Sequence, residues 1–376
     1  MKLLIATGLY PPESGGPATF AKLIEDELGS DFEITTIPFS RVRHYPKIIR
    51  HLLYFWLLLK HSRRQEIILA LDPISVGVPA RMVASVKRLP FTVRLGGDYA
   101  WEQGRQRFGV TCSLDDFAKQ SQLPFIVRLL QQIQTKIVRS ADRVIAPSQY
   151  LKSIIARWGV EENKIEVIYS VSNIKEGNVA TPSTIAEELK VTTKSPVLLS
   201  IARLVPWKGF EVLIEVIEEL KNQYPDIILL IGGDGPQHKI LEEKIKTLQL
   251  EENVKLLGLL TREEIETLSK EVDMFILNTE YEGFSHLLVE CMQLSLPVIT
   301  TNVGGNPELV QHDMSGYLVE YNNKQEIHHA IVKLLEDEHL RNRYVAEAKK
   351  RLQEFSKEKS VQRVRAVLED VINNRI

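Results

Sequence analysis

Two glutamates stand eight residues apart in the stretch EYEGFSHLLVECM, residues 280–292, with a glycine and a serine between them. The strand-like VDMFILNT precedes this stretch, so EYEGFS is expected to be a loop and HLLVECMQL the helix that follows, with Ser285 as its N-cap. Glu282 then belongs to the loop and Glu290 to the helix. The amides near residues 284–287 would face outward as an anion site, whereas the two carboxylates alone would be ordinary surface residues.

A phosphate at this helix start needs positive partners, because two nearby carboxylates repel it. The stretch ARLVPWKGF offers Arg203 at a strand end and Lys208 at the next helix start. Charge-assisted hydrogen bonds contribute about 1.5–3 kcal/mol each and helix-end effects roughly 0.3–1 kcal/mol. The two cations would therefore dominate the binding of a diphosphate. The helix amides would orient it, at Ser285, His286 and Leu287, with the His286 amide mattering more than its ring.

Short apolar strands alternate with amphipathic helical stretches, which predicts α/β units on parallel sheets. The strand KLLIATGL and a helix near Thr19–Leu28 open the chain, and SPVLLSIARLVPWKGFEVL restarts the same pattern. We expect two Rossmann-like, doubly wound domains facing across a cleft, at residues 1–180 and 190–355. The linker is placed at 173–188, where Gly, Pro, Ser and Thr interrupt the periodicity, and a C-terminal helix at about 356–376 is expected to pack back on the first domain.

These residues resemble a known family. Arg203, Lys208, the glutamate pair in EGFSHLLVE, LPVITTNVGGNPELV and the early YPPESGGPATF are similar to the retaining glycosyltransferases of family 4 (glycosyl transferases group 1), which have the GT-B fold. The resemblance covers about residues 3–355. It implies that Arg203 and Lys208 bind the donor diphosphate, that Glu282 contacts the donor sugar and that Glu290 holds the ribose. It also implies a nucleotide-sugar donor, most simply a UDP- or GDP-sugar, used without a metal and with retention of anomeric configuration.

Further candidates lie at other loop positions. Gly15 and Gly16 follow the first strand, and the resemblance brings this loop to the donor phosphates and the acceptor. Asp98, in VRLGGDYAWE, stands where many relatives carry a histidine, so it is a candidate catalytic or acceptor contact. Asp98 could equally be a turn residue, and Gly15–Gly16 only a tight turn. Further candidates are Tyr10 and Asp72 for the acceptor and Gly258 and Leu260 for the nucleobase.

The composition limits the function further. The chain of 376 residues has a net charge of −2, but residues 1–175 carry 24 Lys and Arg against 16 Asp and Glu, which suggests that this half meets something anionic. Two distant cysteines and an N-terminus without a signal-peptide pattern predict a protein of the reducing cytoplasm. No Asp-x-Asp and no zinc-like His/Cys cluster occurs, so neither a metal nor another cofactor is expected and the charge of the diphosphate falls to Arg203 and Lys208.

Residues 41–64, RVRHYPKIIRHLLYFWLLLKHSRR, contain seven Lys or Arg and no acid. One interpretation is a helix that makes peripheral contact with the inner face of the membrane and brings the enzyme to a lipid-linked acceptor. The other is a domain helix whose Leu, Phe and Trp side chains pack on the sheet. The apolar run covers most of the helix circumference, which favours burial.

The leading hypothesis is therefore a hexosyltransferase-type glycosyltransferase for a glycan, lipid-linked or small-molecule acceptor, typical of cell-envelope polysaccharide synthesis and with no nucleic-acid partner. A dinucleotide-binding oxidoreductase is disfavoured, because no Gly-x-Gly-x-x-Gly follows either first strand. A non-catalytic nucleotide-sugar binding protein is the alternative, although Glu282 and Lys208, which such a protein would be expected to lose, are both present.

Overall fold

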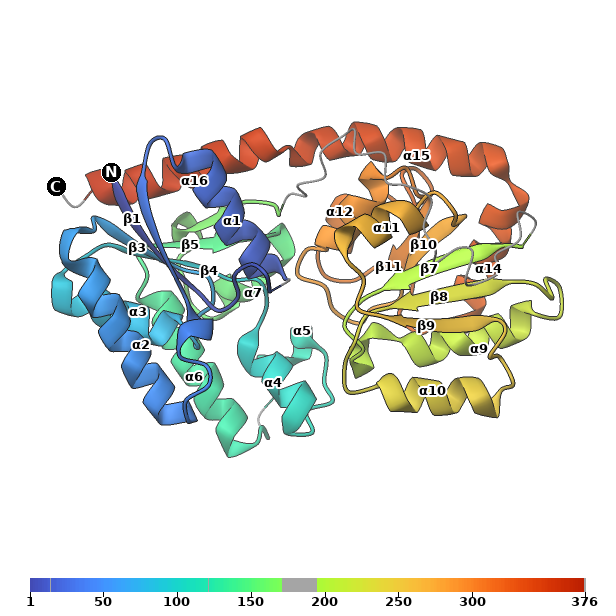
Figure 1. Ribbon diagram of the computed structural model, residues 1–376, viewed down its shortest axis with the longest axis horizontal. Coiled ribbons are helices and arrows are strands. Elements are labelled where there is room, and N and C mark those ends of the chain that lie inside the picture. Colours follow the sequence, from blue (N-terminus) through green and yellow to red (C-terminus); the bar gives the residue numbers. More distant parts are fainter. Residues whose placement is uncertain (14, 121, 171–194, 375–376) are drawn as a thin grey trace. The chain divides into compact units, whose positions relative to one another are not determined.

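The computed structural model describes residues 1–13, 15–120, 122–170 and 195–374. The chain divides into two compact units: unit 1 comprises Met1–Val171 and Phe355–Ile376, and unit 2 comprises Ser172–Glu354. Each unit has one six-stranded parallel sheet flanked by helices (Figure 1), which confirms the predicted pair of Rossmann-like α/β folds. The linker predicted at 173–188 lies outside the described residues.

The sheet of unit 1 has the strand order β2-β1-β3-β4-β5-β6. Its strands are β1 (Lys2–Thr7), β2 (Glu33–Pro38), β3 (Ile67–Ala70), β4 (Phe91–Arg94), β5 (Arg143–Ala146) and β6 (Ile165–Val167). The central strands β3 and β4 are buried throughout, as expected for a parallel sheet covered on both faces. Because β2 lies on one side of β1 and β3 on the other, the strand order reverses between β1 and β3, the usual place for a ligand in such sheets.

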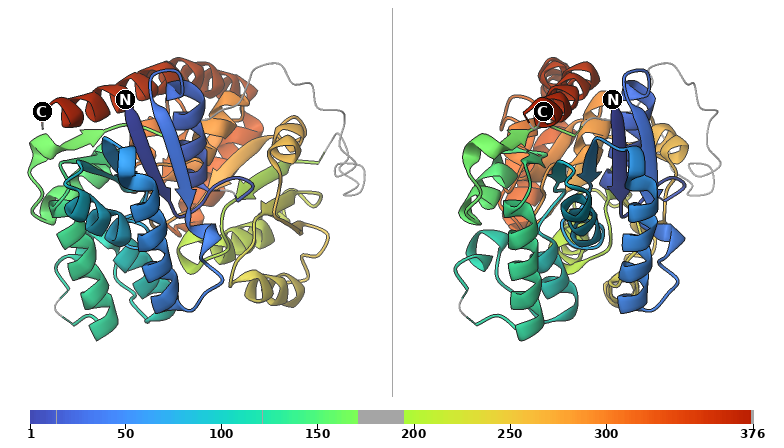
Figure 2. Two further views of the ribbon diagram at one scale, coloured as in Figure 1. Left: turned by 60° about the vertical axis from the view of Figure 1, so that its left-hand side comes forward. Right: turned by 90° about the vertical axis from the view of Figure 1, so that its left-hand side faces the viewer.

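Two groups of helices cover this sheet. The helices α2 (Lys47–His61), α3 (Gly77–Lys87) and α6 (Phe125–Arg139) lie in one layer, whereas α1 (Gly16–Leu28) and α16 (Lys357–Asn373) lie on the opposite face (Figures 1 and 2). Helix α1 begins at Gly16, earlier than predicted, because a proline in the first turn has its backbone already set for a helix start. The remaining helical segments are α4 (Tyr99–Arg107), α5 (Leu114–Phe117), α7 (Gln149–Arg157), η1 (Phe39–Arg41), η2 (Ser62–Arg64) and η3 (Glu162–Lys164).

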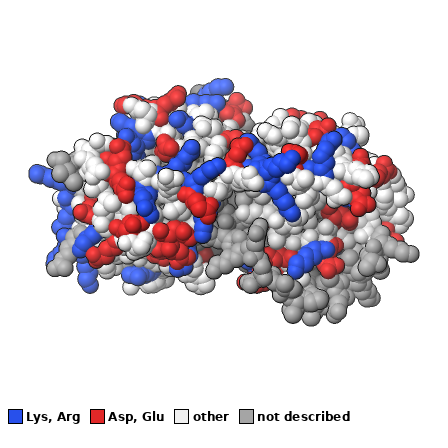
Figure 3. All heavy atoms as spheres, turned by 90° about the horizontal axis from the view of Figure 1, so that it is seen from above, with Lys and Arg blue, Asp and Glu red and all other residues white. Residues whose placement is uncertain are grey.

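Helix α16 comes from the end of the chain but packs into the core of unit 1. Its Val361, Val364 and Leu368 join a buried cluster with residues of α1, β1 and β3. Fully burying such an aliphatic side chain contributes about 1.5–3 kcal/mol. Around this apolar seam, Lys357 pairs with Glu27 of α1 at 2.8 Å, and the face seen in Figure 3 carries acidic and basic side chains intermixed.

The sheet of unit 2 has the order β12-β11-β10-β7-β8-β9. Its strands are β7 (Val197–Ile201), β8 (Ile228–Gly232), β9 (Val254–Gly258), β10 (Met274–Leu277), β11 (Val298–Thr301) and β12 (Tyr317–Val319). The chain moves from β7 to β8 and β9 in one direction, then returns to the other side of β7 with β10. The strand order therefore reverses between β7 and β10, and their two following loops start side by side.

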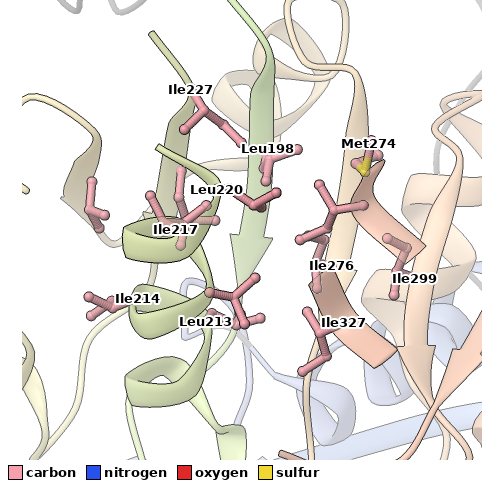
Figure 4. Close-up of a cluster of buried hydrophobic side chains, with 14 of the residues drawn as sticks. Leu198, Leu213, Ile214, Ile217, Leu220, Ile227, Met274, Ile276, Ile299 and Ile327 are labelled. Atoms are coloured by element: carbon pink, nitrogen blue, oxygen red, sulfur yellow. The ribbon is translucent and has the colours of Figure 1, made fainter. Parts of the chain in front are cut away.

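The helices of unit 2 are α9 (Phe210–Leu220), α10 (His238–Thr247), α11 (Arg262–Leu268), α12 (His286–Gln293), α13 (Asn306–Leu309), α14 (Lys324–Glu336) and α15 (Glu338–Leu352), with η4 (Pro206–Lys208) before α9 and η5 (Gln353–Phe355) after α15. The apolar stripe predicted for α9 is buried: Leu213, Ile217 and Leu220 face Leu198 of β7 and Ile276 of β10 (Figure 4). This core fixes the strand ends that carry the candidate site.

Within the described ranges, no helix combines the length and the apolar character that crossing a membrane requires.

Candidate functional site

Lys208 and Glu282 meet at the point in unit 2 where the strand order reverses. Lys208 ends the short 3₁₀ helix η4 after β7, and Glu282 lies in the loop after β10. The Lys208 Nζ atom donates to Glu282 Oε2 at 2.5 Å, and both side chains are mostly shielded, with 12% and 20% exposed. Residues 74 positions apart in the chain thus form one cation–carboxylate pair at the carboxyl edge of the sheet.

A set of hydrogen bonds holds the two loops together. The amide of Glu280 donates to the carbonyl of Trp207 at 2.8 Å, which ties the loop after β10 directly to η4. Asn278, 1% exposed, donates from Nδ2 to the Gly209 carbonyl at 3.0 Å and accepts at Oδ1 from the Asn322 amide at 3.1 Å. Buried, satisfied polar networks rigidify their surroundings, so the lysine and the glutamate are fixed by backbone rather than by their own contact alone.

Gly304 and Gly305 close the other side of the Glu282 loop. The amide of Gly305 donates to the Glu282 carbonyl at 2.9 Å. Gly304 has a φ of +58°, and a Cβ there would lie 2.1 Å from the Glu282 carbonyl oxygen. Only glycine can supply both the left-handed backbone and this close approach. The GG of LPVITTNVGGNPELV therefore shapes the site, a role that the sequence motif did not specify.

Helix α12 begins directly after this loop, as predicted. Ser285 is its N-cap, and the Ser285 hydroxyl accepts from the Leu288 amide at 3.2 Å. The cap binds the Leu288 amide, and His286 and Leu287 precede that residue in the first turn of the helix. A phosphate role for Ser285, His286 and Leu287 stays a prediction.

Glu290 pairs with an arginine that the sequence analysis did not single out. Arg262, the first residue of α11, donates from Nη2 to Glu290 Oε1 at 3.2 Å, and the Glu290 side chain is 19% exposed. The Arg262 Nε atom also lies 3.9 Å from Oε1 of Glu266, one turn further along α11. Its position could be anticipated only in part: Thr261 and Glu264 form a capping box that marks the start of α11, but no sequence signal pairs α11 with α12.

The other unit 2 candidates lie along the same edge of the sheet. Arg203 follows β7 and is exposed; in the described part of the chain it has no ion pair with a carboxylate. Gly258 ends β9 with a φ of +71°, and its carbonyl accepts from the Gly233 amide at 2.6 Å. Leu260 packs close to Gly232, where a Cβ would lie 2.6 Å from the Leu260 side chain. Diphosphate and nucleobase roles for these residues remain predictions.

In unit 1, Asp72 and the loop after β1 meet where that sheet reverses its strand order. Asp72 Oδ1 accepts from the amides of Ile74 at 2.7 Å and Ser75 at 2.6 Å. A Cβ on Gly8 would lie 3.2 Å from Asp72 Oδ2, so the glycine leaves room for the carboxyl. Burial raises the pKa of Asp72 to about 6, although its backbone hydrogen bonds lower it.

Tyr10 and the two glycines lie in the same loop region of unit 1. The Tyr10 hydroxyl donates to Glu25 Oε2 of α1 at 2.5 Å, and this hydrogen bond raises the pKa of Tyr10. Gly15 has a φ of +138°, and its carbonyl accepts from the Thr19 amide at 3.0 Å, while Gly16 is the first residue of α1. Acceptor or phosphate contact by these residues is a prediction.

Asp98 has a structural task in unit 1. It is the N-cap of α4, 1% exposed, and its Oδ1 accepts from the Trp101 amide at 2.9 Å and from Gln134 Nε2 at 3.0 Å. Among the described residues, Asp98 Oδ2 has no hydrogen-bond donor. Burial raises the pKa of Asp98 to about 6. The turn-residue interpretation of Asp98 fits this position, and direct contact with a substrate stays a prediction because so little of the side chain is exposed.

A metal ion would need a cluster of ligating side chains. The described residues hold no group of three His, Cys, Asp or Glu side chains placed to bind a metal ion. Independence from metal and cofactor stays a prediction about the reaction.

Comparison with known proteins covers both units. The family model "Glycosyltransferase Family 4" matches residues 15–171, and the model "Glycosyl transferases group 1" matches residues 183–351. One subunit of human phosphatidylinositol N-acetylglucosaminyltransferase is 31% identical over 149 residues, which is 40% of this chain and 30% of the human protein. N-acetyl-alpha-D-glucosaminyl L-malate synthase of Bacillus anthracis is 27% identical over 57% of this chain and 56% of the relative. The chain thus spans between about a third and just over half of these relatives.

Solved structures resemble nearly the whole chain. Anabaena HepE in complex with UDP-glucose has a TM-score of 0.79 at 21% identity, covering 98% of this chain and 100% of HepE. Sucrose-phosphate synthase from Thermosynechococcus elongatus has a TM-score of 0.78 at 15% identity, covering 99% of both chains. At these identities the likeness establishes the fold.

Proposed function

The chain belongs to the GT-B glycosyltransferases of group 1 and family 4, and we propose that it is an active hexosyltransferase using a nucleotide-sugar donor. The donor is a UDP- or GDP-sugar, and the acceptor is a glycan, a lipid-linked molecule or a small molecule. Transfer proceeds with retention and without a metal. The observation that carries this proposal is the Lys208–Glu282 pair at the strand-order reversal of unit 2, on the segment after β7 that also carries Arg203 and on the loop that leads into α12.

The donor diphosphate would bind by displacing the Glu282 carboxylate from the Lys208 ammonium. A phosphate oxygen competes with Glu282 Oε2 for the Lys208 ammonium. Arg203 adds a second cation, whose planar guanidinium can donate two parallel hydrogen bonds to a phosphate. Two charge-assisted contacts of about 1.5–3 kcal/mol each outweigh the roughly 0.3–1 kcal/mol of the α12 amides. As the bond to the leaving phosphate breaks, the negative charge on the diphosphate grows, and these cations stabilise the transition state more than the ground state.

Glu282, released from Lys208, would accept hydrogen bonds from the hydroxyls of the donor sugar. In the front-face route, the acceptor oxygen bonds to the anomeric carbon on the face that the phosphate leaves, and the leaving phosphate takes the acceptor proton. Glu290, oriented by Arg262, would accept from the ribose hydroxyls. No residue of the chain then needs to form a covalent bond with the sugar.

A thermal-shift screen tests donor binding first. Wild-type protein and Lys208→Ala are heated with UDP-, GDP- and ADP-sugars, each far above its expected dissociation constant. A ligand at about 100 times its dissociation constant stabilises the folded state by about 2.7 kcal/mol, so one class of donor should shift wild type clearly and the variant little. The absence of any shift in wild type would overturn the proposal.

Transfer is tested with the donor that the screen selects. Release of nucleoside diphosphate that depends on an added acceptor supports an enzyme, whereas binding without turnover indicates the non-catalytic binding protein. The anomeric configuration of the product, read by NMR, tests retention. Unchanged rates in excess EDTA test the independence from metal.

Separately from the transfer activity, we propose that residues 41–64 contact a membrane surface.

A further inference from the structure

Most of the exposed large hydrophobic side chains among the described residues lie on α2, α3 and α6 of unit 1. Helix α2 shows the pattern most clearly, with Ile48, Leu52 and Trp56 exposed by 78%, 56% and 63%. These three residues follow one another at intervals of four, so they form a single stripe along the helix. Tyr54 and Leu58 are buried on the other side. The interpretation in which the Leu, Phe and Trp side chains of this helix pack on the sheet is therefore wrong for Leu52 and Trp56, although Leu58 is buried.

Helix α6 repeats the pattern. Phe125, Ile126 and Leu129, in its first turns, are exposed by 79%, 48% and 43%. Helix α3 lies between α2 and α6 in the same layer and contacts both; its Arg81 Nε donates to Ser140 Oγ, just past the end of α6, at 2.9 Å. Met82 on α3 is also exposed, by 51%. The three helices thus present exposed apolar side chains on one face of unit 1.

The charges on this layer have one sign. Helices α2, α3 and α6 contain no Asp or Glu. Their basic residues are Lys47, Arg50, Lys60, Arg81, Lys87, Arg128, Lys136 and Arg139. The opposite face of the same sheet differs, because α1 and α16 contain both acidic and basic residues (Figure 3). An apolar surface on helices whose acidic residues are absent and whose basic residues are many is complementary to an anionic lipid bilayer, whose head groups attract Lys and Arg while side chains such as Trp and Phe enter the interface.

The apolar residues also lie near the candidate acceptor residues. Helices α2 and α6 lead back into the parallel strands β3 and β5, so their first turns lie at the carboxyl edge of the sheet. Ile48 and Phe125 are in those first turns, and Asp72 and the loop after β1 lie at the same edge. A membrane surface in contact with α2 and α6 would deliver a lipid-anchored acceptor to this edge.

We propose that α2, α3 and α6 form a docking surface for an anionic lipid bilayer, and that the acceptor is accordingly anchored in lipid. The lipid-anchored acceptor rests on the proposed transfer activity, whereas binding of the three helices to a bilayer does not require that activity. A second copy of the chain could also cover an apolar face. The lack of acidic residues on these three helices favours the bilayer, since two such faces would place like charges together.

Vesicle co-sedimentation tests the docking surface. Wild-type protein is mixed with vesicles of phosphatidylcholine alone or of phosphatidylcholine with phosphatidylglycerol, at low and high salt. We expect binding to the anionic vesicles that weakens with salt. The variants Ile48→Ser/Leu52→Ser and Phe125→Ser/Leu129→Ser should each lower the partition coefficient about ten-fold, because these side chains would enter the interface. Lys47→Gln/Lys60→Gln should lower it several-fold and reduce its salt dependence.

The control is Ile240→Ser/Met314→Ser, which removes two side chains of unit 2 that are exposed by 48% and 53%. This control should bind vesicles as wild type does. No binding of wild type to anionic vesicles, or equal binding by wild type and the α2 and α6 variants, overturns the docking surface. So does a dimer, seen by light scattering, that the α2 variant converts to a monomer without any vesicle binding.

The donor thermal shift, measured on the same preparations, separates the two proposals. Lost vesicle binding with a retained donor shift confines the defect to the docking surface and supports it. Vesicle binding by wild type without any donor shift would overturn the proposed function and leave the docking surface standing.

Discussion

The acidic side chains at the carboxyl edges of the two sheets have different kinds of partner. In unit 2, Glu282 is paired with Lys208 and Glu290 with Arg262. In unit 1, Asp72 and Asp98 accept hydrogen bonds from backbone amides and, for Asp98, from Gln134, and the described residues give neither of them an ion pair. Both units have six parallel strands and a reversal of strand order, so the architecture does not dictate this difference.

The difference separates two electrostatic tasks. A cation that is paired with a carboxylate can bind an arriving phosphate instead, which suits an anionic donor. A buried carboxyl without a cation loses hydration on ionising, and the pKa values of Asp72 and Asp98 accordingly rise to about 6. Such groups suit neutral hydroxyl partners or a purely structural role. Substitutions in each unit test this difference.

The largest effect is expected from breaking the charge pair of unit 2. Lys208→Ala and Glu282→Ala should each lower the rate of sugar transfer by about 10²–10³-fold, because each removes a contact that strengthens in the transition state. Initial rates under saturating donor measure this, and far-UV circular dichroism should show an unchanged fold. Lys239→Ala, an exposed lysine on α10, is the matched control and should transfer normally. Transfer at the wild-type rate by either site variant would contradict the assignment.

Gly304→Ala should disturb the Lys208–Glu282 pair by shifting the backbone of Glu282. The new Cβ would meet the Glu282 carbonyl oxygen and the left-handed backbone would be strained, so we expect a loss of about 2–4 kcal/mol in the free energy of unfolding together with reduced donor binding. Urea denaturation measures the stability. Gly109→Ala is the control, since Gly109 has a φ of +67° but open space at its Cβ position. Equal losses in the two variants would show that the contact with Glu282 does not matter.

Asp98→Asn should change how the stability of unit 1 depends on pH. The folded-state pKa of about 6 lies above the ordinary value of 3.8, so the folded state holds the proton more tightly and wild-type stability falls as pH rises from about 4 to above 6. Asparagine keeps the N-cap acceptor but has no charge to desolvate. The variant should therefore gain about 2 kcal/mol relative to wild type between pH 4.5 and pH 7.5.

Denaturant unfolding at the two pH values measures this gain for Asp98→Asn. Glu162→Gln, a surface carboxylate of the same unit, serves as the control. A stability difference between Asp98→Asn and wild type that does not change with pH would remove the contrast between the two units.

The smallest effect is expected at the second charge pair. Arg262→Gln should leave Glu290 in place but less firmly oriented, and raise the donor KM about ten-fold with a smaller change in kcat, as expected for lost ribose positioning. Steady-state kinetics with varied donor separate the two constants. An equal fall in kcat with an unchanged KM would indicate that Arg262 acts in the chemical step instead. Arg262→Lys should restore part of the affinity.

Much of the fold could be anticipated because its signals are local. The strands appear as short apolar runs and α9 as a regular apolar stripe, and the place of Ser285 before a helix predicts its role as a cap. Local signals do not predict whether an apolar side chain on a helix is buried in the core or exposed on the surface. The stripe Ile48, Leu52 and Trp56 is as apolar as a core helix, and only its place at the outside of the layer leaves it exposed.

The features of the candidate site can also be separated into those set by local sequence and those set by contacts between distant residues. The fold class, the loop position of Glu282 and the helix position of Glu290 follow from local patterns, because strand ends, glycines and caps are encoded within a few residues. Three contacts depend on the packing of distant segments: Lys208 pairs with Glu282, Arg262 pairs with Glu290, and Gly304 approaches the Glu282 carbonyl. These partners lie 22 to 74 residues apart, and only the order of strands in the sheet brings their loops together.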